Sequence, residues 1–251
     1  ADEEMITKIV EAVVKCKRPR PLECANYTFR FNNVSLSCIT HFARHRIQSI
    51  EIPELTKTDR TSFIIPPVLK DKPELLEKYK NAFKETADKY ARLKKLGVAE
   101  ELLVYYQLSG NTLDIVTTMN ARQLLLFLRL RSCTRAQWEI QEYAVDALKQ
   151  LRKVEPTIFK FYGPSCFVGA CPEGRMTCGR AAEIKEKFSN LYFKNMKKSR
   201  VKNNRKSFLF PIIALFSLTI SAVFALIMVG GDETIYYLQQ WNFVPDEKTI
   251  C

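Results

Sequence analysis

Glycine and histidine are scarce in this chain of 251 residues, and their scarcity excludes several classes of site. There are eight glycines, the first of them Gly97, and neither GxGxxG nor GxxxxGK[ST] occurs. A glycine-rich loop that wraps a phosphate is therefore excluded, and side chains must bind any phosphate. The two histidines, His41 and His45, have no Asp and Ser in a suitable order around them, so we do not expect a hydrolase triad.

The first residues of the sequence do not have the pattern of a signal peptide, although the chain has eight cysteines. These cysteines therefore predict thiols in a reducing compartment rather than the disulfides of a secreted protein. The glycosylation motifs at Asn26 and Asn33 are then chance matches. Because the chain opens at Ala1 and not at a methionine, we expect further residues before it.

Acidic residues are fewer than basic ones, 27 against 39, which gives a formal net charge of +12. Such an excess indicates an anionic partner, for example a nucleotide or a nucleic acid, although it can also serve solubility alone.

The apolar patterns alternate between strand and helix periods. Residues 3–15 and 73–96 repeat apolar side chains at helical spacing, and Gly97 ends the second helix. Residues 26–35 alternate aromatic and polar side chains as a strand does, and residues 120–154 predict one long helix. We expect an α+β fold in which helices pack around a small antiparallel sheet.

The C-terminal part differs from the rest in composition. Residues 207–231 contain no charged side chain, a stretch long enough to cross a hydrocarbon core of roughly 30 Å. We expect a transmembrane helix there, with a buried core helix as the alternative. The chain then divides into a domain at 1–190, a basic linker at 191–206, this helix, and a short extracytoplasmic tail at 232–251.

The basic linker precedes the apolar stretch, and acidic residues follow it. The positive-inside rule therefore predicts a cytoplasmic N-terminal domain anchored in the cytoplasmic membrane. We expect the linker to contact lipid headgroups rather than nucleic acid. Alternatively, the tail from Met196 onward is a fusion product, because it has the form of the start of a separate membrane protein.

Four arginines lie in the stretch "NARQLLLFLRLRSCTRAQWEIQ", residues 120–141, among leucines that point in nearly every direction of a helix. The pattern predicts a helix buried on all sides. Its arginines need anionic partners, because an unpaired buried guanidinium costs several kcal/mol. They are Arg122, Arg129, Arg131 and Arg135.

A second basic cluster is the tripeptide formed by Arg44, His45 and Arg46. In a strand or turn the two arginines point to one side and the histidine to the other. Two guanidinium groups on one side suit a phosphate or pyrophosphate, although a solvated basic edge is the commoner explanation of such a tripeptide.

The two clusters together carry a family resemblance. The segments "RHRIQS" and "NARQLLLFLRLRSCTRAQWEI" resemble motifs of the flavin-dependent thymidylate synthases, and "RPLECANYTFRF" is similar to the strand entry of that family. The segment "GPSCFVGACPEGRMTCG" resembles a C-terminal extension of some bacterial members. The resemblance covers about residues 5–190.

The resemblance implies reductive methylation of dUMP to dTMP, with FAD as cofactor and NADPH and methylene-tetrahydrofolate as co-substrates. It also implies a homotetramer with its sites between subunits. Arg131 matches the catalytic arginine that grips the uracil ring, and His41 stands near dUMP. The positions that match FAD-binding residues are Glu23, Arg44, His45, Arg46, Ser49, Asn120, Arg122, Leu130 and Arg135.

The chain departs from the family pattern mainly on the nucleotide side. Residues 51–57, "EIPELTK", lack the usual serine and arginine, and Val104 stands where an arginine is usual. His41 replaces a glutamine, and Cys24 replaces a histidine. The alternative function is therefore a paralogue that binds FAD or a nucleotide and has lost dUMP methylation.

Three cysteines near the end of the first domain have a spacing that suits soft metals. Cys166, Cys171 and Cys178 could hold zinc or an iron–sulfur cluster, with a fourth ligand from Cys133 or elsewhere. The alternative is three ordinary thiols.

Overall fold

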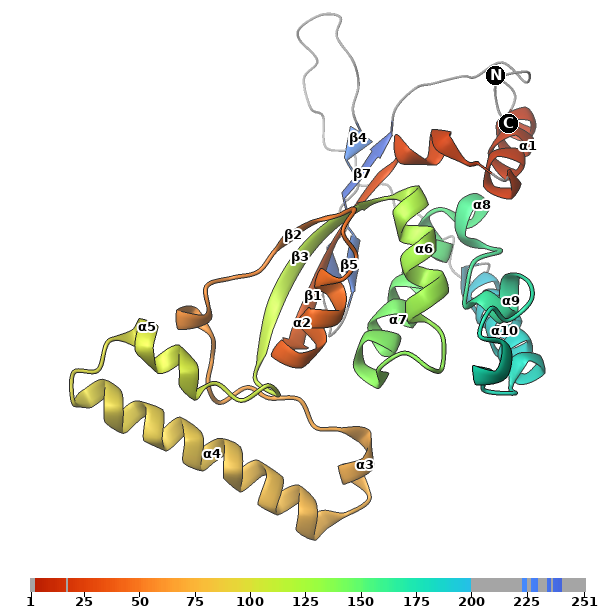
Figure 1. Cartoon of the computed structure of the whole chain (residues 1–251). Helices are drawn as coiled ribbons and strands as arrows, with labels where there is room; N and C mark the ends of the chain where they lie inside the picture. The colour runs from red at the N-terminus through yellow and green to blue at the C-terminus, as the bar shows by residue number, and fades with distance from the viewer. Residues whose placement is uncertain are drawn as a thin grey trace, which may run out of the picture.

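A three-stranded antiparallel sheet lies at the centre of the fold (Figure 1). The computed structural model describes residues 3–199 apart from residue 17, together with four short strands between residues 223 and 240. The central strands lie in the order β2 (Ser49–Glu51), β3 (Thr112–Asn120) and β1 (Asn26–Ser35). The α+β prediction is confirmed.

Strand β1 forms where the alternating pattern predicted it. Tyr27, Phe29 and Phe31 are buried, whereas Arg30 between them is exposed and pairs with Asp114 of β3. One face of the strand therefore joins the core. Short C-terminal strands extend the sheet beyond β1, with β5 parallel and β7 antiparallel to it. Their bounds are β4 (Val223–Phe224), β5 (Ile227–Val229), β6 (Thr234–Ile235) and β7 (Tyr237–Gln240).

Helices lie before, between and after the strands along the chain. The α-helices are α1 (Glu3–Lys15), α2 (Leu36–Ala43), α3 (Pro67–Lys70), α4 (Pro73–Lys95), α5 (Glu100–Leu103), α6 (Ala121–Arg131), α7 (Trp138–Val154), α8 (Pro156–Phe159), α9 (Ser165–Val168) and α10 (Ala181–Ser199). The 3-10 turns are η1 (Arg20–Glu23), η2 (Leu55–Lys57), η3 (Val104–Tyr106) and η4 (Gly174–Met176). Helices α2 and α6 contact the central strands. Helices α1 and α4 confirm two of the predicted ranges, and Gly97 has the positive φ of 84° that its stop position requires.

The prediction of one continuous helix over residues 120–154 is wrong. Residues 132–137 interrupt it, so that α6 ends at Arg131 and α7 begins at Trp138. The hydroxyl of Ser132 donates to the Leu128 carbonyl at 2.5 Å, and the Gln137 side chain accepts from the Ile140 N–H at 3.0 Å. The Leu128 carbonyl at the end of α6 and the Ile140 N–H at the start of α7 are thus bonded to polar side chains.

Helix α6 is also less buried than its leucines suggested. Leu126 and Leu130 expose 45% and 46% of their surface, while Leu124 and Phe127 are buried. The prediction of burial on all sides is therefore wrong, because α6 covers the sheet with one face and leaves another open.

Residues 156–191 pack onto α7 through one buried cation. The Arg152 guanidinium donates to the carbonyls of Phe159 at 3.1 Å, Phe188 at 2.8 Å and Tyr162 at 2.7 Å. A buried charge with its N–H groups bonded in this way is tolerated. The C-terminal extension is therefore anchored to the same core as the sheet.

The predicted membrane helix over residues 207–231 lies largely outside the described residues, and the described pieces of that range, β4 and β5, are strands. Within the part of the chain that is described, no helix has the length and apolar character that a bilayer crossing needs. Most of the basic linker and of the tail also lie outside the described residues.

Candidate functional site

His45 lies at the centre of the contact between the turn after α2 and the helix α6. Three side chains of α6, spaced four residues apart, meet its imidazole. Gln123 faces Nδ1 at 3.4 Å, the Phe127 ring packs edge-on with 5.1 Å between ring centroids, and Arg131 Nε donates to Nε2 at 2.8 Å. His45 is consequently only 6% exposed.

The guanidinium of Arg131 is held from two directions. Besides its bond to His45, its Nη2 donates to the His41 carbonyl at 3.2 Å. His41 lies in α2 and His45 in the turn after it, so Arg131 is brought to the backbone of His41, the other predicted substrate residue. The guanidinium is thereby fixed in orientation at the C-terminal end of α6.

The pKa shifts of His45 and Arg131 agree with the bond between them. Burial, and then the charge of Arg131, lower the pKa of His45 to about 4. Because Nε2 accepts the bond from Arg131, the neutral imidazole carries its proton on Nδ1, and the Gln123 amide must then turn its oxygen toward that N–H. Burial and the nearby charge of Arg44 lower the pKa of Arg131 as well, but a guanidinium remains charged.

The opposite end of α6 holds a second group of predicted residues. Asn120 caps the helix by accepting from the Gln123 N–H at 2.8 Å. Arg122 forms an ion pair with Glu23 of η1, but both side chains are about half exposed, so burial is not what requires this partner. Nine residues along a helix separate Arg122 from Arg131, a distance of roughly 14 Å.

Arg44 and Arg46 are exposed on either side of the buried His45, as the alternation predicted. Within the described residues neither arginine forms an ion pair. Two exposed guanidinium groups of this kind suit a pyrophosphate, which binds such groups bidentately. Ser49, the last residue of the motif, is exposed at the start of β2.

Leu130 and Arg135 occupy different environments. Leu130 is 46% exposed next to Arg131 and offers an apolar surface beside the cation. Arg135 lies in the interruption between α6 and α7, and its Nη1 donates to the Met176 carbonyl of η4. The sequence missed Gln123 and Phe127, although their four-residue spacing before Arg131 was the signal that could have found them.

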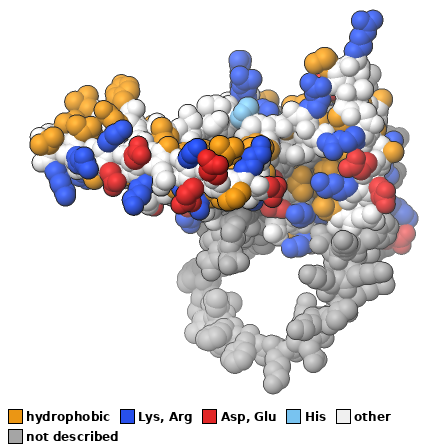
Figure 2. All heavy atoms as spheres, turned by 90° about the horizontal axis from the view of Figure 1, so that it is seen from below, with side chains coloured by type: hydrophobic (Ala, Val, Ile, Leu, Met, Phe, Trp, Pro, Cys, Tyr) orange, Lys and Arg blue, Asp and Glu red, His pale blue; other side chains and the backbone are white. Residues whose placement is uncertain are grey.

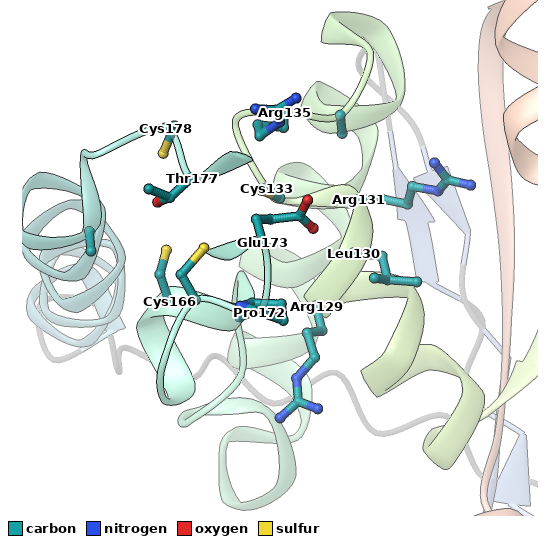
Figure 3. A pocket seen from close by; sticks show the side chains of 14 residues that line it. Arg129, Leu130, Arg131, Cys133, Arg135, Cys166, Pro172, Glu173, Thr177 and Cys178 are labelled. Carbon is teal, nitrogen blue, oxygen red and sulfur yellow. The ribbon is translucent and has the colours of Figure 1, made fainter. Parts of the chain in front are cut away.

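The predicted metal ligands gather around one cavity of about 280 Å³ (Figure 3). Cys166, Cys171 and Cys178 line it together with Cys133 of the α6–α7 interruption. Burial, followed by the neighbouring thiol of Cys133, raises the pKa of Cys166. Among the described residues no three His, Cys, Asp or Glu side chains are grouped to hold a metal ion. The prediction of zinc or an iron–sulfur cluster at these cysteines therefore finds no support in the described residues.

Comparisons with known proteins agree with the motifs. Residues 1–157 match the family model described as thymidylate synthase complementing protein. The flavin-dependent thymidylate synthase of Geobacter sulfurreducens is 34% identical over 190 residues, which is 74% of this chain and 82% of the relative. The enzyme of that name from Clostridium tetani is 37% identical over 204 residues, 73% of this chain and 81% of the relative. A third, from Saccharolobus solfataricus, is 40% identical over 157 residues, 59% of this chain and 57% of the relative.

Proposed function

Because this chain belongs to the flavin-dependent thymidylate synthase family, we propose that it methylates dUMP to dTMP with FAD, NADPH and methylene-tetrahydrofolate. The observation that carries the proposal is the guanidinium of Arg131, fixed at the end of α6 by the imidazole of His45 and the carbonyl of His41.

The residues around α6 fit a dinucleotide cofactor. Arg44 and Arg46 are exposed cations that suit its pyrophosphate. Arg122 and Glu23 supply a donor and an acceptor at the other end of the helix, and Leu130 offers apolar contact to a ring. When bound, FAD supplies the hydride that reduces the carbon taken from methylene-tetrahydrofolate.

Arg131 would act on the pyrimidine. Negative charge must build up on a uracil ring before its C5 can attack a carbon donor, and a fixed cation would stabilise that charge without reorganising. His45 would act through Arg131: its neutral imidazole accepts from Nε and so aims the opposite edge of the guanidinium away from the core. His45 is thus a positioning residue, and Arg131 is the catalytic one.

The test uses the full chain. Bound flavin is measured by its absorbance, and turnover by the release of tritium from C5 of labelled dUMP in the presence of NADPH and methylene-tetrahydrofolate. We expect a yellow protein that releases tritium. Arg131→Lys should lower kcat roughly 100-fold or more while leaving the flavin content unchanged, because lysine keeps the charge but loses the planar fork.

Arg30→Lys is the matched control, because Arg30 is an exposed arginine of β1 whose ion pair, among the described residues, is with the surface carboxylate of Asp114. It should keep the rate of the parent protein. A colourless protein would contradict the proposal. A yellow protein that leaves dUMP untouched would instead favour the FAD-binding paralogue, in line with the altered residues 51–57.

A further inference from the structure

Thr117 is the polar member of an otherwise apolar row of side chains on the buried face of β3. Every second residue of the strand is at most 8% exposed, and the row consists of Leu113, Ile115, Thr117 and Met119. A buried hydroxyl needs a hydrogen-bond partner. The Thr117 hydroxyl donates to Oε1 of Gln48 at 2.8 Å. A polar contact therefore joins the buried face of the sheet to the residue just before β2.

The amide of Gln48 makes a second bond, to the end of α2. Its Nε2 donates to the Phe42 carbonyl at 2.6 Å, and the same carbonyl accepts from the His45 N–H at 3.0 Å. Because a carbonyl can only accept, the nitrogen of the amide must face Phe42 and its oxygen must face Thr117. The two partners therefore fix the orientation of the Gln48 side chain.

These two bonds close the turn between α2 and β2. The turn carries Arg44, His45 and Arg46, and Gln48 at its end is bonded back to Phe42 at its beginning. The same side chain is bonded to β3, the middle strand of the central sheet. One residue therefore connects the turn both to α2 and to the sheet.

The two halves of the turn are held differently. His45 anchors the first half through its bond to Arg131 of α6. In the second half Arg46 is exposed and Ile47 exposes 65% of its surface, so these side chains add little packing. The bonds of Gln48 therefore determine where the second half of the turn lies relative to His45.

We propose that Gln48 is a positioning residue for the flavin cofactor and for Arg131. It keeps the arginines of the turn where they can bind the pyrophosphate, and it keeps His45 where its imidazole fixes the guanidinium of Arg131. This role rests on the proposed function, because it gives Gln48 a part in binding FAD and in methylation. Without its bonds only a fraction of the molecules has the binding geometry, and the apparent Kd for FAD rises by the inverse of that fraction.

The first test replaces Gln48 in the full chain. Gln48→Met has a side chain of similar length and loses both hydrogen bonds. We expect the Kd for FAD, measured by titration of flavin-free protein, to rise roughly 10-fold or more, and kcat at saturating FAD to fall several-fold. An unchanged Kd in a variant with the circular dichroism of the parent protein would show that Gln48 only completes the core.

The second test removes one of the two bonds. Thr117→Val keeps the shape of the buried side chain and should raise the Kd for FAD roughly fivefold. The double variant Gln48→Met/Thr117→Val should bind FAD as Gln48→Met alone does, because Thr117 acts through Gln48. Additive effects of the two changes would contradict this link.

Thr112→Val is the matched control for Thr117→Val. Thr112 is a buried threonine of the same strand, and its hydroxyl is bonded to the Ser62 hydroxyl at 2.5 Å. It lies five residues before Thr117, a distance of roughly 17 Å along a strand. This variant should bind FAD as the parent protein does, and an equal rise of the Kd in both variants would overturn the proposal.

A third measurement depends neither on flavin nor on turnover. The chain has two histidines, and NMR of labelled histidine follows the titration of each, with His41→Gln to assign the signals. In Gln48→Met the pKa of His45 should rise from about 4 toward its ordinary value of 6.5, because a released turn exposes the ring to water. A pKa that stays near 4 would overturn the role of Gln48.

The same measurement separates this proposal from the proposed function. If the parent protein binds no flavin, the proposed function fails, and the pKa of His45 still decides whether Gln48 holds the turn. If Gln48→Met does not fold, Thr117→Val carries the same measurements, and unchanged values of both the Kd for FAD and the pKa of His45 would overturn the proposal.

Discussion

At the scale of single residues, the environment of His45 decides its protonation state. An ordinary histidine titrates near pH 6.5, but this one is enclosed by Gln123 and Phe127 and accepts a bond from Arg131. Burial and the adjacent positive charge both disfavour the imidazolium form. The bond to Arg131 therefore persists at neutral pH.

The pH dependence of stability follows from this shift. In the unfolded chain His45 gains a proton below about pH 6.5, whereas in the folded protein it gains one only near pH 4. The contribution of His45 to stability is therefore complete above pH 6.5 and is lost as the pH falls toward 4. Between pH 6.5 and 4 we expect this residue to lower the free energy of unfolding by about 3 kcal/mol. Urea unfolding at several pH values measures this loss.

His45→Gln provides the comparison, because glutamine can accept from Arg131 but does not titrate. Its free energy of unfolding should fall less steeply between pH 6.5 and 4 than that of the parent protein. Identical slopes for the two proteins would show that His45 is not the titrating group.

At the scale of elements, the start of α7 holds the start of α2. Glu139, 2% exposed, accepts from the Ser35 N–H at 2.8 Å and from the Ser35 hydroxyl at 2.6 Å. Ser35 in turn caps α2 by accepting from the Cys38 N–H at 3.0 Å. Burial raises the pKa of Glu139, while its bonds to Ser35 oppose that rise. The acid of the "AQWEI" segment is therefore a structural link to the helix that leads into His45.

Removing this link should destabilise the fold. Glu139→Ala leaves two donors of Ser35 without their acceptor and should lower the free energy of unfolding by roughly 3 kcal/mol. Glu139→Gln keeps one acceptor oxygen and should cost about half as much. Urea unfolding monitored by circular dichroism gives both values.

The exposed Glu142, one turn further along α7, is the matched position. Glu142→Ala should change stability by no more than about 0.5 kcal/mol. An equal effect of the alanine substitution at both positions would mean that the bonds to Ser35 contribute nothing specific.

At the scale of the whole molecule, helices α3 to α5 form an arm that extends from the body (Figure 1). Figure 2 shows apolar side chains gathered at the far end of this arm. Leu96, Leu102 and Tyr105 there expose 80%, 61% and 87% of their surface. An apolar patch of this kind marks an interaction surface, and the expected homotetramer would cover it.

Assembly is therefore expected to depend on the arm. The full chain should have the mass of four subunits in size-exclusion chromatography with light scattering. Tyr105→Asp should shift the population toward smaller species at micromolar concentration, because a charge would be buried at the contact. Tyr105→Phe keeps the apolar ring and should assemble as the parent protein does. If Tyr105→Asp also remains a tetramer, the arm is not the contact.

The sequence by itself determined several local elements and the family. Alternation fixed the buried face of β1, apolar spacing and Gly97 fixed α4, and the motifs containing His45 and Arg131 identified the family. These features could be predicted because each depends on residues close together in the chain. The local backbone geometry repeats the direction of side chains every 2 residues in a strand and every 3.6 residues in a helix. The same local rules failed at residues 132–137, where Ser132 and Gln137 bond to the backbone and divide the predicted helix.

Only the tertiary structure decided which distant side chains meet. The bond between Arg131 and His45 spans 86 positions, and the one between Glu139 and Ser35 spans 104. Cys133 joins the three C-terminal cysteines only because residues 156–191 fold back onto α7 around Arg152. Such pairings depend on how whole elements pack, and packing places side chains through long-range contacts that no local pattern encodes.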